Sequence, residues 1–310
     1  MAEIIQRDGT WAFDGSTIRI TPGLHRSVPL FRQTYGEIAV PLEAVSGVGY
    51  EPERRHGRLR MRLREGADPL LQATGGRLPD AADPYRLTVD ADRSGVAEYV
   101  AEEIRRALLL DEVPKEPTTA YLLPGPPVPV SVRSSDGTVS FDGSQVRIDW
   151  ADTSDRVKRA TGSRIIDLGE LVQVEWLPNS GYEDGFLRFV TRETVFSKLP
   201  PERDPYTLDL WGSVRRDLLT ALVAAAATAR LPHPSARVGA ASSFRDRPPA
   251  AVPAQADRDR ADHDRAGHDR ADHHDALLRR LRELGELHRD GVLTDEEFAM
   301  AKAVVLRGFG

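Results

Sequence analysis

The chain has 310 residues, a formal net charge of −6 and no cysteine. Its length allows two or three domains with separate cores, and the lack of cysteine excludes disulfides and thiolate metal sites. The acidic balance makes nucleic acid an unlikely partner, and the absence of a long apolar run predicts a cytoplasmic chain without a membrane span.

A stretch near the start of the chain occurs twice. Residues 8–20 and 136–148 are identical at nine of thirteen positions, and both contain Asp-Gly-Thr followed by Phe-Asp-Gly-Ser. Apolar residues alternate on both sides of the Asp-Gly-Ser tip, a pattern that predicts two short strands joined by a tight turn. The duplication therefore predicts two β domains of the same fold.

The residues after the first copy predict more strands and one helix. The expected strands are 37–41, 45–51, 57–64, 70–74 and 85–89. Ser94 is a candidate N-cap for a helix that carries one apolar stripe and ends near Leu110. The first repeat, residues 1–110, is therefore predicted to have six or seven strands and a C-terminal helix.

The second copy is followed by the same order of elements. Gly185-Phe-Leu-Arg-Phe corresponds to Gly57-Arg-Leu-Arg-Met, and Asp204-Pro-Tyr corresponds to Asp83-Pro-Tyr. Ser213 is predicted to cap a helix that runs to about Arg230 and is stopped by Pro232. The second repeat is assigned to residues 132–231.

Two segments of biased composition connect the folded parts. Residues 111–131 contain six prolines and predict a semi-rigid spacer, in which residues 121–123 (Tyr-Leu-Leu) could dock on one of the repeats. Residues 232–275 are rich in Ala, Arg, Asp and His, with too little apolar surface to offset the entropy of ordering. This segment is predicted to be disordered, so its histidines are not expected to form a metal site.

The last segment, residues 276–310, predicts an αα-hairpin. Asp290-Gly291 supplies the turn, and Thr294 with Glu297 forms a capping box for the second helix. Such a hairpin is too small to fold without a partner surface, which belongs to another copy, to the repeats or to a different protein. The candidate oligomerisation residues are Leu277, Leu278, Leu281, Leu284, Leu287, Phe298, Ala301, Val304 and Val305.

A row of arginines in the first repeat is the most suggestive surface. The arginine row consists of Arg58, Arg60, Arg62 and Arg64. Because these residues alternate with apolar ones, they are expected to project from one face of one strand. The row could bind an anionic membrane surface or phosphate groups, or it could be an exposed face paired with neighbouring acids. The equivalent positions in the second repeat are Phe186, Arg188, Val190 and Arg192.

These features resemble known families. The strands and closing helix of each repeat resemble a pleckstrin-homology-like (PH-like) barrel, and the two motifs resemble a bacterial domain of unknown function that often occurs in tandem. Residues 277–306 resemble the SHOCT (short C-terminal) domain, which implies a role in oligomerisation. PH modules often bind phosphoinositides through a basic first hairpin loop, whereas the loop here, Asp14-Gly15-Ser16, is acidic. The expected fold is mainly β with α, with two PH-like barrels and a C-terminal αα-hairpin.

No catalytic motif accompanies these elements. The sequence has no glycine-rich phosphate loop, nucleophile elbow or zincin helix, so neither an enzyme nor a cofactor is expected. The leading hypothesis is a non-enzymatic cytoplasmic scaffold or adaptor whose repeats bind a protein partner and whose hairpin mediates self-assembly or recruitment. The alternative is a peripheral membrane or anionic-ligand binding module that uses the arginine row.

Overall fold

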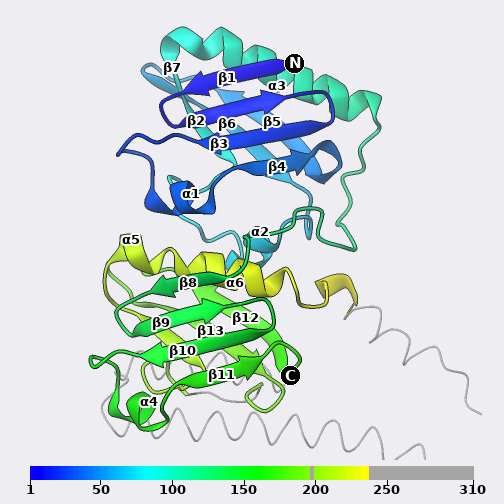
Figure 1. The fold of residues 1–310 in the computed structure, drawn as a ribbon. Coiled ribbons are helices and arrows are strands. Elements are labelled where there is room, and N and C mark those ends of the chain that lie inside the picture. The colour runs from blue at the N-terminus through cyan, green and yellow to red at the C-terminus, as the bar shows by residue number, and fades with distance from the viewer. Residues whose placement is uncertain (196–198, 237–310) are drawn as a thin grey trace, which may run out of the picture. The chain divides into compact units, whose positions relative to one another are not determined.

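The structure, a computed structural model, describes residues 1–195 and 199–236 (Figure 1). Both repeats lie within one compact unit, Met1–Arg247. The predicted C-terminal hairpin and most of the predicted disordered linker lie outside the described residues.

The first repeat contains a four-stranded sheet, a three-stranded sheet and a C-terminal helix. The first sheet has the order β1-β2-β3-β4 and the second β5-β6-β7, with antiparallel pairing throughout. Helix α3 lies across these strands, as Figure 1 shows, and buries Val100 and Ile104 in their core. The strands are β1 (Ala2–Gln6), β2 (Gly9–Phe13), β3 (Thr17–Pro22), β4 (Ile38–Pro41), β5 (Val45–Glu51), β6 (His56–Leu63) and β7 (Arg86–Asp90). The helices are α1 (Leu30–Tyr35), α2 (Pro69–Thr74) and α3 (Ser94–Leu110), with 3-10 turns at η1 (Leu42–Ala44) and η2 (Ala91–Arg93).

The second repeat has the same topology. Its sheets have the orders β8-β9-β10-β11 and β12-β13-β14. The strands are β8 (Val130–Arg133), β9 (Gly137–Phe141), β10 (Gln145–Trp150), β11 (Arg164–Asp167), β12 (Leu171–Leu177), β13 (Gly185–Thr191) and β14 (Thr207–Leu210). The helices are α4 (Arg156–Ala160), α5 (Val214–Asp217) and α6 (Thr220–Thr228). The repeated sequence therefore corresponds to a repeated fold.

The duplicated hairpin is confirmed in both repeats. The pairs β2–β3 and β9–β10 are antiparallel neighbours. At each tip, Asp14 or Asp142 accepts hydrogen bonds from the backbone N–H groups two and three residues further on, which forms an Asx turn. These backbone hydrogen bonds lower the pKa of both carboxyls. The acidic tip is thus explained by turn geometry.

The predicted strand at residues 70–74 is wrong, because these residues form part of helix α2. Asp68 is the N-cap and its carboxylate accepts from the backbone N–H of Leu70 and Leu71, while Pro69 occupies the first helical turn. Gly75 ends the helix in the left-handed conformation, with φ of 57°. These capping signals outweigh the strand propensity of a short apolar run.

Other elements also differ from the expectations. The described strands form four separate antiparallel sheets, so each repeat has two open sheets and no closed barrel among the described residues. The helix predicted to run from residue 213 to 230 is divided into α5 and α6. Strands β1 and β8 and helices α1 and α4 were not predicted, because each is short and carries little periodic signal.

The core of the second repeat includes side chains from the first. All nine residues of α6 are buried, and α2 packs against this helix. Phe31 of α1, with Leu70 and Ala73 of α2, belongs to the same hydrophobic cluster as the strands of the second repeat. The small alanine side chains of α6 allow this close packing on several sides. The second repeat's core is therefore completed by residues of the first repeat, which also has a core of its own.

Helix α2 lies in a segment that is longer in the first repeat than in the second. The corresponding motifs begin 26 residues apart in the first repeat, at Gly57 and Asp83, but 19 residues apart in the second, at Gly185 and Asp204. The first repeat thus has seven additional residues in the segment that contains α2, the helix that contacts α6. This insertion joins the two repeats.

The proline-rich spacer is docked on the first repeat. The backbone N–H groups of Leu122 and Leu123 donate to the Ala67 carbonyl at 2.8 and 3.1 Å, and Leu123 is buried in the first repeat's core. The aromatic ring of Tyr121 contacts that of His233, with 4.8 Å between centroids. The docking expected for residues 121–123 is thereby confirmed.

Asp68 gives the fold a pH-dependent stability. Burial raises the pKa of its carboxyl to about 6, although Tyr85 Oη donates to it at 2.8 Å. Because the unfolded pKa is near 3.8, the folded state binds the proton more tightly. We expect the free energy of unfolding to increase as pH falls from about 7 to about 4, by on the order of 3 kcal/mol from Asp68. Burial raises the pKa of Asp209 to about 6 as well, with the same sign.

Urea unfolding across this pH range checks the expectation. Asp68→Asn should flatten the pH dependence, because the side chain no longer titrates. Asp142→Asn is the matched control, since the lowered pKa of Asp142 restricts its effect to more acidic solutions. Equal slopes for Asp68→Asn and the unmodified protein would contradict this account.

Candidate functional site

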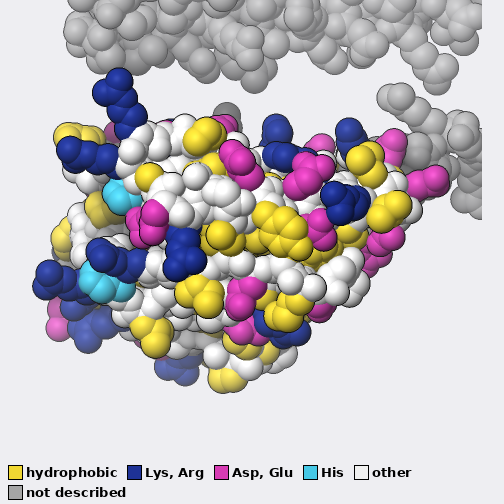
Figure 2. Space-filling model, turned by 90° about the horizontal axis from the view of Figure 1, so that it is seen from above, with side chains coloured by type: hydrophobic (Ala, Val, Ile, Leu, Met, Phe, Trp, Pro, Cys, Tyr) yellow, Lys and Arg dark blue, Asp and Glu magenta, His cyan; other side chains and the backbone are white. Residues whose placement is uncertain are grey.

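The arginine row lies on β6, the central strand of the sheet β5-β6-β7. Leu59 and Met61 point into the core, whereas Arg58, Arg60 and Arg62 are exposed, as the alternating pattern predicted. Figure 2 shows Lys, Arg and His side chains gathered toward one edge of the face that it displays. Three exposed guanidinium groups therefore lie on one face of one strand, in a chain whose net charge is −6.

Two members of the row have structural partners. Arg58 pairs with Glu53 in the β5–β6 connection. Arg64 lies beyond the strand, where its guanidinium donates to the backbone carbonyls of Glu116 at 2.9 Å and Glu43 at 3.0 Å. Arg64 therefore connects the proline-rich spacer to the first repeat through hydrogen bonds.

Arg60 and Arg62 differ from these two residues. Within residues 1–195 and 199–236, neither guanidinium has an ion-pair or hydrogen-bond partner, and both side chains are exposed. A groove of about 280 Å³ runs beside them and is also lined by Arg86 and by the carboxylates of Asp80 and Asp83, both of which pair with Arg86. Of the four candidate anion-binding residues, these two are exposed and unpaired within the part of the chain that the structure describes, and anion binding by any of them stays a prediction.

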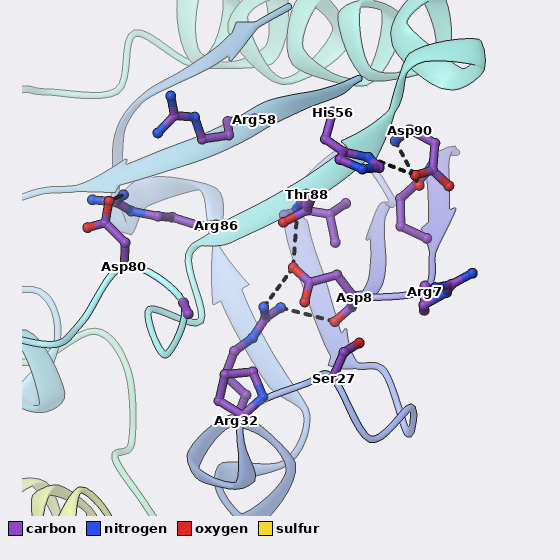
Figure 3. Close-up of a pocket in the computed structure, with 14 residues that line it drawn as sticks. Arg7, Asp8, Ser27, Arg32, His56, Arg58, Asp80, Arg86, Thr88 and Asp90 are labelled. Carbon is purple, nitrogen blue, oxygen red and sulfur yellow. Dashed lines mark hydrogen bonds and ion pairs between the residues drawn. The ribbon is translucent and has the colours of Figure 1, made fainter. Parts of the chain in front are cut away.

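A second, larger cleft lies next to the row (Figure 3). It has a volume of about 450 Å³ and is lined by residues of β1, α1, β6 and β7. In Figure 3, Arg32 and the backbone N–H of Thr88 both point at the Asp8 carboxylate, with Nη1–Oδ2 and N–Oδ2 distances of 2.8 and 3.2 Å. Arg7 and Arg58 are directed away from this network.

Three carboxylates that line the cleft each lie beside a basic side chain. Besides the Asp8–Arg32 pair, Arg86 Nη1 lies 2.5 Å from Asp80 Oδ2, and His56 Nδ1 lies 3.2 Å from Asp90 Oδ1. Each lining carboxylate thus has a basic neighbour. The arrangement links the two sheets of the repeat.

The second repeat contains the same link in a more buried form. Asp136, equivalent to Asp8, lies 2.6 Å from Lys158 Nζ and accepts from the Asp209 backbone N–H at 2.9 Å. The exposed fractions of the side chains are 3% for Asp136 and 0% for Lys158, compared with 22% for Asp8. Sequence reasoning missed both pairs, although the Asp that begins each duplicated motif was the available signal.

The glycine after each of these aspartates has a steric role. A Cβ atom at Gly9 would lie 2.7 Å from the Thr21 carbonyl oxygen, and one at Gly137 would lie 2.4 Å from that of Asp149. Only glycine allows the neighbouring backbones to approach this closely. In each motif, the aspartate therefore forms an ion pair, and the glycine after it allows a close contact with a neighbouring backbone.

The candidate oligomerisation residues, Leu277 to Val305, lie outside the described residues, so their role stays a prediction. Among residues that are described, no helix combines the length and apolar character required to cross a bilayer.

Comparison with protein families gives two matches. The model described as a domain of unknown function (DUF4429) matches residues 11–105 and 139–228, one segment in each repeat. The model described as a short C-terminal domain (SHOCT) matches residues 279–306. No curated protein was found to match the chain.

Proposed function

The chain belongs to the family of domains of unknown function DUF4429, which it carries twice before a SHOCT domain, and from this premise we propose that it is a non-enzymatic cytoplasmic adaptor. In this proposal the paired repeats bind a protein partner. The SHOCT segment oligomerises the chain or recruits it to another assembly.

The packing of first-repeat side chains into the second repeat's core is the observation that carries the proposal. Because α2 of the first repeat packs on α6 of the second, the repeats form one unit that offers the outer surfaces of both. The outer surface of α3 exposes Tyr99, Leu109 and Leu110, and Figure 2 shows hydrophobic side chains on the surface of this unit. Exposed apolar side chains of this kind are typical of protein-binding surfaces.

The PH-like relationship of the repeats belongs to the same proposal. It is supported by the succession of four strands, three strands and a closing helix in each repeat. One fold can host many unrelated functions, so the likeness does not specify a ligand.

Sedimentation of the full-length protein and of a truncation ending at Arg247 tests the adaptor proposal. The truncation keeps the complete compact unit. We expect an oligomer for the full-length protein and a monomer for the truncation. Leu281→Asp, in the predicted apolar stripe, should behave like the truncation, whereas the neighbouring Arg280→Asp should remain oligomeric. Equal monomeric masses for all proteins would refute self-assembly through the hairpin.

A second candidate function is peripheral binding to an anionic surface through the arginine row. The exposed and unpaired state of Arg60 and Arg62 among the described residues favours it. Flotation with vesicles that contain phosphatidylglycerol tests this function. Protein that floats with such vesicles, but not with neutral ones, would support it.

A further inference from the structure

The two repeats treat one arginine position differently. Arg188 on β13 of the second repeat corresponds to Arg60 on β6 of the first. Arg188 is only 20% exposed, and its Nε lies 3.1 Å from Asp204 Oδ2. Its Nη1 lies 3.9 Å from Glu175 Oε2, and its Nη2 donates to the Leu199 carbonyl at 2.8 Å. The second repeat thus surrounds this arginine with two carboxylates and a backbone carbonyl.

Each carboxylate that neutralises Arg188 is missing or occupied in the first repeat. The residue paired with Arg60 on β5 is Gly49, at the place where Glu175 is paired with Arg188. Asp83, which corresponds to Asp204, is instead bound to Arg86 Nε at 2.9 Å. Arg60 therefore retains its charge and its exposure.

Arg62, the next arginine on β6, also lies opposite a glycine that the second repeat does not have. Arg62 replaces Val190, and the residue opposite it is Gly47, whereas Gln173 is opposite Val190. Both strands have a β-bulge here, between Val45 and Gly47 in β5 and between Leu171 and Gln173 in β12. Because the bulge in β12 is formed with Gln173, the bulge in β5 does not require a glycine at residue 47. A Cβ atom at Gly47 or Gly49 would meet no atom within 4 Å, so neither glycine is required by packing.

Glycines inside a strand weaken it and often mark a place where a ligand approaches the backbone. Here they leave open space beside two unpaired guanidinium groups. Side chains two residues apart on a strand are separated by about 6.6 Å, which allows both guanidinium groups to reach one tetrahedral anion. Guanidinium groups bind phosphate oxygens through paired, charge-assisted hydrogen bonds.

We propose that Arg60 and Arg62, above Gly47 and Gly49, form a binding site for a phosphate group that is present in the first repeat and absent from the second. The site uses the same two arginines as the second candidate function, but it does not require binding to a surface, and it is independent of the adaptor proposal. Its ligand is a phosphate monoester or diester, either free in solution or in a lipid headgroup.

The experiment uses the full-length protein and two probes, inorganic pyrophosphate measured by calorimetry and phosphatidylglycerol vesicles measured by flotation. The decisive variant is Gly49→Glu, which places a carboxylate where the second repeat has Glu175. The backbone of Gly49 is not left-handed and space is open around it, so this variant should fold normally. Gly49→Gln adds a side chain of the same size without the charge. Gln173→Glu adds the same charge at an exposed site on the second repeat.

We expect Gly49→Glu and the double variant Arg60→Gln/Arg62→Gln to weaken probe binding by about tenfold or more. Gly49→Gln and Gln173→Glu should change it by less than about threefold. Binding of pyrophosphate alone would identify a soluble ligand, and it would refute surface binding while supporting the phosphate site. Binding to vesicles alone would identify a lipid headgroup. Binding of neither probe, or equal binding by the unmodified protein and Gly49→Glu, would overturn the proposal.

Discussion

Asp136→Ala is expected to lower the free energy of unfolding by about 3–5 kcal/mol, the range for breaking a buried ion pair. Removal of this carboxylate leaves the ammonium group of Lys158, which has no exposed surface, without its charged partner. The ring of Trp150, 5.1 Å from Lys158 Nζ, compensates only in part. The Asp209 backbone N–H also loses its acceptor. Because this donor belongs to β14, the variant weakens the link between the two sheets of the second repeat.

Two control variants separate the effect of burial on stability from the effect of ion pairing alone. Arg147 and Asp149 lie 2.8 Å apart, close to the Asp136–Lys158 distance, but their side chains are 55% and 42% exposed. Arg147→Ala should therefore cost less than about 1 kcal/mol. Asp8→Ala should have an intermediate effect, because the Asp8 carboxylate is 22% exposed, compared with 3% for Asp136. Urea unfolding measures all three values, and a cost for Asp136→Ala as small as that for Arg147→Ala would contradict the expected role of the buried pair.

The duplication made the architecture accessible from the sequence. A tight turn between two alternating stretches is a local signal, and finding it twice predicted both hairpins and the repetition of the later strands. The alternating pattern of β6 also predicted which side chains are exposed. Short elements such as α1 and α4 carry too few residues for periodicity, and their position depends on a tertiary ion pair with Asp8 or Asp136.

The candidate site could be predicted only in part from the sequence, because it too depends on tertiary contacts. The sequence identified the arginine row, but the partners of Arg58 and Arg64 lie in connecting segments whose path the sequence does not specify. The open surroundings of Arg60 depend on which residue pairs with it on β5. The strand register pairs Arg60 with Gly49, whereas it pairs the equivalent Arg188 with Glu175, and this difference is not visible without the structure.

Leu70→Ala is expected to lower the free energy of unfolding by about 2–5 kcal/mol, the range for a fully buried leucine. Its effect should appear in the second repeat, although Leu70 belongs to the first. The side chain has no exposed surface and lies in the hydrophobic cluster that includes α6. A cavity at this position removes packing from the alanine-rich helix, whose own short side chains cannot fill the space. We therefore expect faster amide hydrogen exchange in α6.

Leu59→Ala is the matched comparison. Leu59 is equally buried, but it lies in the separate cluster of the first repeat. Its truncation should cost a similar free energy and accelerate exchange first in β5 and β7, the neighbours of β6. Unchanged exchange in α6 of Leu70→Ala would show that the repeats are packed independently. Faster exchange confined to α6 and the strands beneath it would instead support α2 as the element that transmits stability between the repeats.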